Sequence, residues 1–171
     1  GLRSYPAGRF GEKNAFSISS QLTKFGHTLI RLKTGTPPRI SLKSIDLSRV
    51  ERSPGDDVFF PFSLYSKKGK NNNVCCFTVN TNVAVHRVIE KNLFSSPMFS
   101  GKIKGVGPRY CPSIEDKIFR FKNRASHQLF LEPEWFGSNQ IYVNGFSTSL
   151  PYDVQDQALK KIPALKHVEF I

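Results

Sequence analysis

Cys111 is the residue of this sequence whose neighbours best suit covalent chemistry. Lys104, Arg109 and Lys117 lie within seven residues of it, and nearby cations lower a thiol pKa, which raises the fraction of nucleophilic thiolate. The surrounding glycines and prolines favour a shaped loop over a regular helix or a central strand. A lone cysteine is more often a small buried apolar residue, so the sequence leaves open both a nucleophilic and a packing role.

The other candidates for chemistry are weaker. Cys75 and Cys76 are adjacent within the apolar run VCCFTV and are predicted to be strand residues that pack. Glu115 and Asp116 are neighbours, and this spacing suits charges at the start of a helix better than a paired-carboxylate site. The four histidines are scattered without metal-ligand spacing, so the sequence predicts no metal site.

The charge of the chain predicts a polyanionic partner. The 25 Lys and Arg residues exceed the 13 Asp and Glu residues, which gives a net charge of +12. The excess is greatest over 1–50, with nine basic and two acidic residues, and over 101–124, with seven and two. We expect nucleic acid, and the other interpretation is a solvated basic surface. The predicted nucleic-acid contacts are Lys33, Arg39, Lys102 and Lys104.

The compartment and the size of the folded unit follow from composition. Three cysteines, two of them adjacent, cannot form a disulfide framework, which predicts a reducing compartment. No apolar run approaches the roughly 20 residues of a membrane span, and residues 1–11 are too polar for a signal peptide. With 171 residues and 39% apolar residues, the chain is predicted to fold as one domain or as one large piece of a larger protein.

Hydrophobic periodicity predicts the helices that must position these residues. Apolar residues at helical spacing predict a helix over 14–25 that ends at Gly26, and another over 82–94 with Thr81 as its cap. A further helix is expected over 153–162. Ser113 is expected to cap a helix or turn that follows Cys111. The buried residues predicted for the second helix are Val85, Val88, Ile89 and Phe94.

Apolar and β-branched runs predict the strands. These β-rich runs lie at 27–32, 58–64, 74–79, 127–131, 140–143 and near Val168. Helices and strands therefore alternate, which predicts a mixed sheet with helices, of the α/β or the α+β class.

Neither glycine-rich motif has the spacing of a nucleotide-binding fingerprint. TGTPPR at 34–39 lacks the spacing of a P-loop, and GVGPRYC at 105–111 lacks a third glycine and loses one backbone amide at Pro108. The sequence therefore offers no dinucleotide fingerprint of the Rossmann type within this chain.

Four long motifs resemble the GidA/MnmG family of flavoproteins, which modify the wobble uridine of certain tRNAs. They are RLKTGTPPR at 31–39, SSPMFSGKIKGVGPRYCPSIEDK at 95–117, HQLFLEPE at 127–134 and YVNGFSTSLPYDVQ at 142–155. The resemblance implies an internal fragment of α/β class: an insertion domain with the adjoining part of a glutathione-reductase-like FAD-binding domain. It assigns 1–40 to the part leading into the insert, 41–135 to the inserted domain with NADH- and tRNA-facing loops, and 136–171 to the return segment.

The resemblance also implies the site residues and the cofactors. Cys111 falls on the family's proposed catalytic cysteine, as a thiolate that adds to uridine C6 or as a handler of the one-carbon unit. The implied cofactors are FAD, bound mostly outside this chain, NADH, and methylene-tetrahydrofolate as one-carbon donor. The segment implied to bind NADH consists of Gly107, Pro108, Arg109, Tyr110, Cys111, Pro112, Ser113, Ile114, Glu115, Asp116, Lys117, Ile118, Phe119, Arg120 and Phe121.

The implied partners are tRNA and a GTPase of the MnmE type, with a homodimer at full length and no membrane. The implied location is the cytoplasm, or the mitochondrial matrix for an organellar protein. The chain is thus predicted to be a fragment of a tRNA-modifying flavoenzyme, inactive alone. The other function left open is a stand-alone basic tRNA-binding module without catalysis, although retention of Cys111 within GPRYCPSIEDK favours the enzyme.

Overall fold

The computed structural model describes residues 1–8, 12–66, 69, 74–103, 105–107 and 112–171. Within these residues the chain forms a five-stranded sheet in the order β1-β5-β4-β3-β2, in which every neighbouring pair is antiparallel. The strands are β1 (Arg39–Ser41), β2 (Glu51–Ser53), β3 (Cys76–Asn80), β4 (Gln128–Pro133) and β5 (Gln140–Asn144). The predicted α/β class is confirmed, and strands from both sides of the expected boundary at 135/136 share this sheet.

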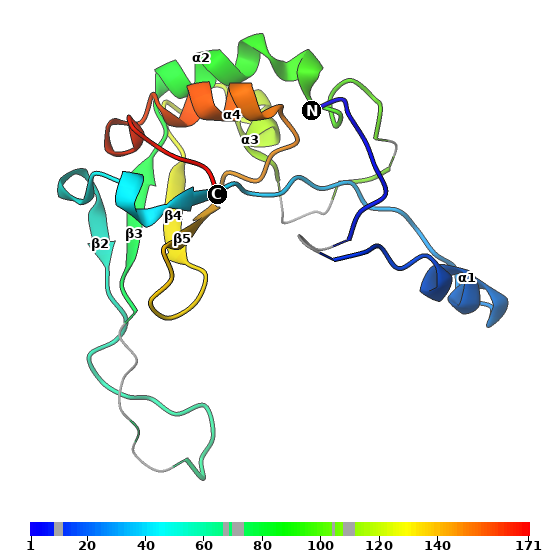
Figure 1. Ribbon diagram of the computed structural model, residues 1–171, viewed down its shortest axis with the longest axis horizontal. Coiled ribbons are helices and arrows are strands. Elements are labelled where there is room, and N and C mark those ends of the chain that lie inside the picture. Colours follow the sequence, from blue (N-terminus) through cyan, green and yellow to red (C-terminus); the bar gives the residue numbers. More distant parts are fainter. Residues whose placement is uncertain (9–11, 67–68, 70–73, 104, 108–111) are drawn as a thin grey trace.

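One face of the sheet carries the core. Alternate residues of the two central strands are fully buried, namely Leu129 and Leu131 on β4 and Ile141 and Val143 on β5. The intervening residues face outward, as the period of two in a strand requires. Figure 1 shows three helices gathered on the covered side. These are α2 (Val83–Lys91), α3 (Ile114–Arg120) and α4 (Tyr152–Leu159), and their apolar residues join the same core cluster.

The predicted helix over 82–94 is confirmed, with two corrections. The cap of α2 is Asn82, whose side chain accepts a hydrogen bond from the Val85 amide, and Thr81 is not the cap. Phe94 was expected in the core but is 87% exposed, because α2 ends at Lys91 and a short 3₁₀ turn (Leu93–Ser95) redirects the chain. Val85 and Ile89 are buried as predicted.

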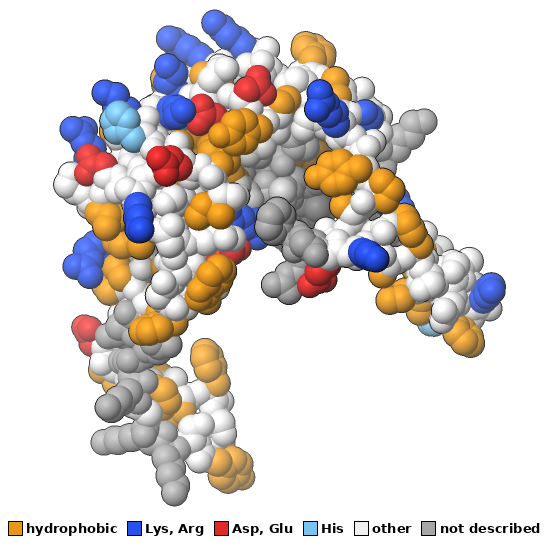
Figure 2. Space-filling view, in the orientation of Figure 1, with side chains coloured by type: hydrophobic (Ala, Val, Ile, Leu, Met, Phe, Trp, Pro, Cys, Tyr) orange, Lys and Arg blue, Asp and Glu red, His pale blue; other side chains and the backbone are white. Residues whose placement is uncertain are grey.

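The helix predicted over 14–25 is present as α1 (Ser17–Lys24), and Gly26 follows it with a φ of 85°. No residue of α1 is buried, and Ile18, Leu22 and Phe25 are exposed. In Figure 1, α1 stands on an arm away from the sheet. Figure 2 shows hydrophobic side chains on this arm and on the loop that projects from β2 and β3. The apolar stripe of α1 therefore packs on no element of the described chain.

Three strand predictions are wrong. Residues 58–64 form no strand, and 27–32 contribute only an isolated bridge between Leu32 and Val106. The segment near Val168 makes only an isolated bridge between Ile40 and Phe170. A β-rich composition fits a half-buried sheet surface. Residues 58–64 pair with no described strand, 27–32 meet only Val106, and the segment near Val168 bonds to β1 over too few residues to form a strand. The strands predicted at 74–79, 127–131 and 140–143, and the helix at 153–162, are present with shifted ends.

Candidate functional site

The candidate site lies where the four sequence motifs meet, around α3. Ser113 caps this helix as predicted, since its hydroxyl accepts a hydrogen bond from the Asp116 amide at 3.1 Å. Pro112 precedes it and is partly buried. Predicted site residues Lys104, Pro108, Arg109, Tyr110 and Cys111 lie outside the described residues. What the structure gives is therefore the position of both ends of the loop that carries Cys111.

Residues 145–150, here called the brace segment, hold the start of α3. The Ile114 amide donates to Ser147 O at 2.7 Å, and the Ser149 amide donates to Glu115 Oε1 at 3.0 Å. The Lys117 ammonium donates to Gly145 O at 3.1 Å. Three residues of the SIEDK motif, Ile114, Glu115 and Lys117, are thus bonded, through backbone or side chain, to one short segment of the YVNGFSTSLPYDVQ motif.

Glu115 is a fully buried carboxylate within this arrangement. Its Oε1 also accepts a hydrogen bond from the Ser96 hydroxyl at 3.1 Å, and that hydroxyl lies 2.7 Å from Ser149 Oγ. Its Oε2 accepts no hydrogen bond from the part of the chain that the structure describes. Because burying a carboxylate costs free energy, its hydrogen bonds are part of what fixes the three segments against one another. The helix-start role expected for Glu115 is therefore replaced by an internal link.

The TGTPPR motif is paired with the same brace segment. Thr36 and Thr148 exchange backbone hydrogen bonds of 3.0 and 3.3 Å. A Cβ atom added at Gly35 would lie 2.5 Å from Thr148 N, a distance that side chains do not tolerate. Glycine is therefore required at position 35 by a close backbone approach and not by phosphate binding.

Lys33 lies against the segment that leads to Cys111. Its amide donates to Val106 O at 3.1 Å, and its ammonium donates to Met98 O at 3.3 Å. A Cβ atom at Gly105, which has a φ of 145°, would lie 2.8 Å from Arg31 O. The RLK strand-like segment and the GVG turn therefore pack backbone to backbone.

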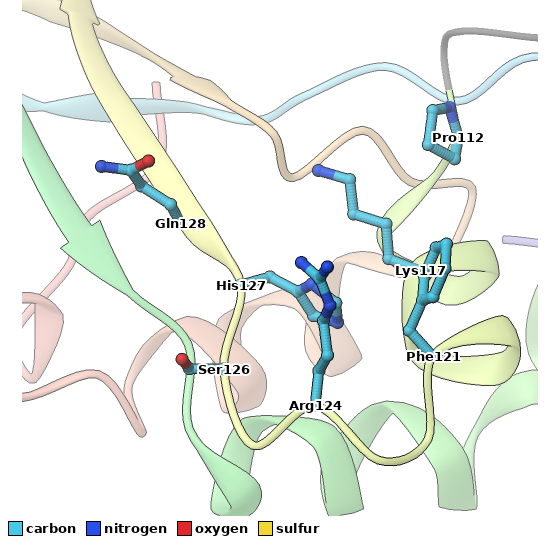
Figure 3. Close-up of a pocket in the computed structure, with 7 residues that line it drawn as sticks. All are labelled: Pro112, Lys117, Phe121, Arg124, Ser126, His127 and Gln128. Atoms are coloured by element: carbon cyan, nitrogen blue, oxygen red, sulfur yellow. The ribbon is translucent and has the colours of Figure 1, made fainter.

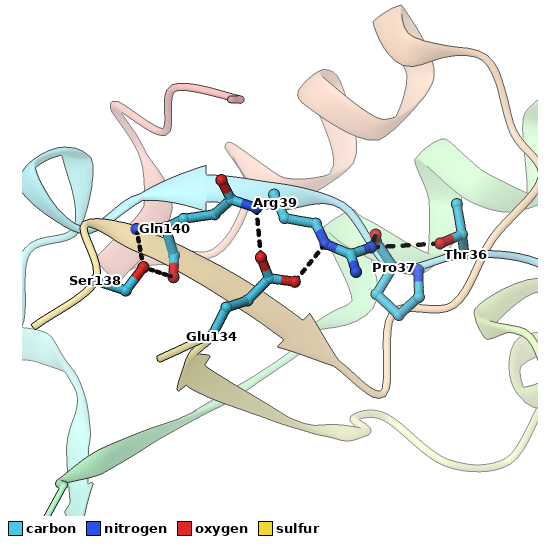
Figure 4. Close-up of polar contacts among 6 residues, drawn as sticks. All are labelled: Thr36, Pro37, Arg39, Glu134, Ser138 and Gln140. Carbon is cyan, nitrogen blue, oxygen red and sulfur yellow. Dashed lines mark hydrogen bonds and ion pairs between the residues drawn. The ribbon is translucent and has the colours of Figure 1, made fainter. Parts of the chain in front are cut away.

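The predicted nucleic-acid residue Arg39 is held by several groups, as Figure 4 shows. Its Nε lies 2.8 Å from Glu134 Oε1, and its guanidinium carbon lies 4.7 Å from the centre of the Tyr142 ring. Its Nη1 donates to Pro37 O at 2.9 Å, and Gln140 donates to the other Glu134 oxygen. Much of the Arg39 charge is thereby engaged inside the fold. Lys102 donates to the carbonyl of Leu2. Phosphate binding by Lys33, Arg39, Lys102 and Lys104 stays a prediction.

A hollow of about 310 Å³ opens beside α3 (Figure 3). Lys117 borders it from α3 and Phe121 from the residue that directly follows this helix. Arg124 extends from the loop after the helix, and His127 borders the hollow beside β4. Among the described residues its lining contains no carboxylate and consists of Pro112, Lys117, Phe121, Arg124, Ser126, His127 and Gln128. Burial lowers the pKa of His127, and the nearby charges of His86, Lys117 and Arg124 lower it further. The hollow is therefore electropositive and suits an anionic ligand.

Sequence reasoning did not single out Arg124, Ser126, His127 or Gln128. The available signal was the mixture of basic and aromatic residues in KIFRFKNR at 117–124, of which the family resemblance assigns only 117–121 to a binding segment. The two described thiols differ from the reactive type: Cys76 and Cys75 are partly buried, and burial, followed by the nearby Glu132 charge, raises the pKa of the Cys76 thiol. A raised pKa keeps a thiol protonated and unreactive at neutral pH.

The described helices include none that is long and apolar enough to cross a membrane.

Comparison with known proteins places the chain in one family. The family model described as glucose inhibited division protein A matches residues 1–171. The tRNA uridine 5-carboxymethylaminomethyl modification enzyme MnmG of Thermodesulfovibrio yellowstonii is 50% identical over 171 residues, which are 100% of this chain and 27% of the relative. The MnmG enzyme of Bacillus subtilis is 45% identical over 168 residues, which are 98% of this chain and 27% of the relative.

The solved structures agree with this placement. The structure of Aquifex aeolicus GidA in its form I crystal matches with a TM-score of 0.83 and 44% sequence identity, over 98% of this chain and 29% of that one. The chain thus spans little more than a quarter of the length of the relatives that it matches. A match over all 171 residues, in sequence and in fold, shows that the chain belongs to the GidA family.

Proposed function

We propose that this chain is the part of a tRNA wobble-uridine modification enzyme that presents the catalytic loop. Relatives that match over the whole chain carry the name of such an enzyme, and each is almost four times as long as the match. The activity therefore belongs to the protein at full natural length, and we expect the 171-residue chain to be inactive alone. Together with this function we propose the division of the chain into a segment leading into the insert (1–40), an inserted domain (41–135) and a return segment (136–171).

The observation that carries the proposal is the bracing of the loop 108–111 at both ends. Before the loop, Val106 is bonded to Lys33. After it, Ile114 and Glu115 are bonded to the brace segment. A nucleophile contributes most when its position relative to the substrate is fixed before reaction. This bracing supports a positioned Cys111 more than a surface loop kept for phosphate contacts alone.

The proposed chemistry uses Cys111 as a thiolate. Its sulfur adds to C6 of the target uridine, and the C5–C6 π electrons move toward C5 and the O4 carbonyl, so that C5 becomes nucleophilic. C5 then bonds to the methylene carbon of the one-carbon donor, and the electron pair of the carbon–nitrogen bond that breaks passes to the donor nitrogen. Loss of the C5 proton and expulsion of the thiolate restore the uracil ring. A role for the cysteine in handling the one-carbon unit is the other form of this proposal.

The proposed cofactors are NADH on 107–121, FAD mostly outside this chain, and methylene-tetrahydrofolate as the one-carbon donor. The residues present fit a phosphate-bearing cofactor, because the hollow beside α3 contains Lys117 and Arg124 and is lined by no carboxylate. NADH supplies reducing electrons when bound. The proposed partners are tRNA, a GTPase of the MnmE type and a second copy of the protein, in the cytoplasm or the mitochondrial matrix.

The test is Cys111→Ser in the protein at full natural length, with Cys76→Ser as the matched control. We expect Cys111→Ser to reduce modification of tRNA severely while the melting temperature and tRNA affinity stay near those of the wild type, because a hydroxyl is scarcely ionised at neutral pH. Cys76→Ser should keep the activity. Modification is measured by nucleoside analysis of the tRNA, and thiol reactivity by alkylation against pH.

Full activity of Cys111→Ser, with Cys111 alkylated no faster than Cys76, would make the loop structural. A protein that binds tRNA but modifies none, under conditions in which a known relative is active, would favour the alternative of a basic tRNA-binding module.

A further inference from the structure

The surface at the end of α3 has an arrangement that the core does not need. Phe119 and Phe121 are half exposed, at 51% and 49%. The Lys122 ammonium lies 5.1 Å from the centre of the Phe119 ring, and the Arg124 guanidinium carbon lies 5.6 Å from the centre of the Phe121 ring. Two aromatic rings, each with a cation near it, therefore lie two positions apart in the sequence. We call these four residues the α3-end surface.

The charges of this surface are uncompensated. A hollow of about 480 Å³ is lined by Phe119, Arg120, Phe121, Lys122, Asn123 and Arg124, with no carboxylate among them. Arg120 has one ion pair, with Asp116 at 3.8 Å, and its side chain is 71% exposed, so that pair is weak. Lys122 and Arg124 take part in no ion pair among the residues that the structure describes.

The dipole of α3 explains only some of the cations near its end. Cations in the last turn of a helix are stabilised by its dipole, which accounts for Lys117 and Arg120. Lys122 and Arg124 lie beyond the end of α3, and the dipole does not account for two exposed phenyl rings. One ring is also fixed in place, since Phe119 packs edge to face against Phe99 at 5.6 Å. A ring that is held in place and half exposed can serve as a stacking platform for a base.

We propose that the α3-end surface binds a single-stranded part of the RNA substrate, with bases stacked on Phe119 and Phe121 and phosphates near Lys122 and Arg124. This inference rests on the proposed function. A repeat of aromatic ring and cation matches a polymer of base and phosphate better than one small ligand. Because α3 has seven residues, its ends are about 10 Å apart. RNA bound at its end therefore places flanking nucleotides near the loop at its start.

The experiment uses the protein at full natural length and two fluorescent probes, the anticodon stem-loop of a tRNA with uridine at the wobble position and an oligouridine. Binding is measured by anisotropy at several KCl concentrations. Phe119→Leu with Phe121→Leu should weaken binding of both probes about tenfold with little change in salt dependence, because stacking is lost. Lys122→Ala with Arg124→Ala should weaken binding and reduce the slope of log affinity against log salt by about 1.4, for two phosphates.

The matched control is Lys43→Ala with Lys166→Ala, which removes the same charge from a separate hollow at Lys43 and Lys166. We expect the control to bind RNA like the wild type. The inference is overturned if the control loses as much RNA affinity as the test pairs. It is also overturned if neither test pair loses RNA affinity. A loss of NADH affinity with unchanged RNA affinity also overturns it, because the surface then serves the dinucleotide.

The two proposals fail separately. If the wild type modifies tRNA but the test pairs bind and modify normally, the function stands and the RNA surface is wrong. If the wild type modifies no tRNA, yet oligouridine binding falls in the test pairs alone, the surface stands and the function is wrong. Melting temperatures of all variants should match the wild type, since the substituted side chains lie at the surface.

Discussion

His86 and His127 are in contact inside the fold, with ring centres 5.3 Å apart. Thr81 joins them: its hydroxyl accepts a hydrogen bond from the His127 amide at 2.8 Å and lies 2.8 Å from His86 Nε2. This is why Thr81 does not cap α2, although its position before the helix predicted a cap. His127 Nε2 is buried and has no hydrogen-bond partner among the described residues. A buried polar cluster of this kind could not be predicted from sequence, because its members come from separate elements.

The pair should make stability depend on pH. Burial lowers the pKa of both histidines. For His86 the charge of Glu90 opposes this, and for His127 the charges of His86, Lys117 and Arg124 add to it. The unfolded chain, with histidine pKa values near 6.5, binds more protons than the folded chain below that pH. Stability is therefore fully present above about pH 6.5 and falls as the pH decreases.

We expect the melting temperature to fall between pH 7.5 and pH 5.5, a range in which carboxylates stay largely ionised. His86→Gln with His127→Gln should remove much of this fall, and His167→Gln is the control. An unchanged pH profile in the double variant would show that other groups titrate.

At the scale of elements, the central strands and the helices α1, α2 and α4 could be predicted, because their apolar residues recur with the period of a strand or of a helix. Leu129 and Leu131 alternate with outward residues, and Val85 and Ile89 share a helix face. The runs at 27–32 and 58–64 have a similar composition, yet among the described residues the first makes only the isolated bridge of Leu32 and the second pairs with no strand. Whether such a run forms a strand depends on whether the fold places another strand beside it. The local residue pattern does not show this.

The contact between TGTPPR and the brace segment gives a prediction at this scale. Gly35→Ala places a methyl group 2.5 Å from Thr148 N, so the two backbones must separate. We expect a loss of stability of about 2 kcal/mol or more, as for other severe steric changes, together with loss of modification activity. Urea unfolding measures the stability. Gly107→Ala, whose added methyl meets nothing within 4 Å, is the control for stability alone. Equal stability of the two variants would mean that the segment can shift.

At the scale of the whole molecule, the core and α1 should contribute very differently to the free energy of unfolding. Leu131 is fully buried in the sheet, whereas Leu22 lies on a helix that buries no residue. In urea unfolding of the 171-residue chain, Leu131→Ala should cost about 2–5 kcal/mol. Leu22→Ala should change stability by about 0.5 kcal/mol or less. A comparable loss in both variants would show that α1 packs within the chain.

The site as a whole was only partly predictable. The motifs identified the segments that form the site, and the family resemblance identified Cys111. The sequence did not show that Lys33 bonds to Met98 or that Glu115 bonds to Ser149. Such meetings depend on how the sheet brings distant segments together. The role of Glu115 as a buried link was missed for this reason, because adjacent charges at a helix start usually face water.

The brace segment has a consequence for synthesis of the protein. Its bond to Glu115 spans 34 residues, the bond between Lys33 and Met98 spans 65, and that between Arg39 and Glu134 spans 95. A ribosome that has made Cys111 has not yet made Ser149. Until the brace segment emerges, the nascent chain carries the cysteine loop without the support that fixes its far end. Contacts between residues so far apart in sequence carry a larger loop-closure entropy cost, so the start of α3 should gain its support from the brace segment late in folding.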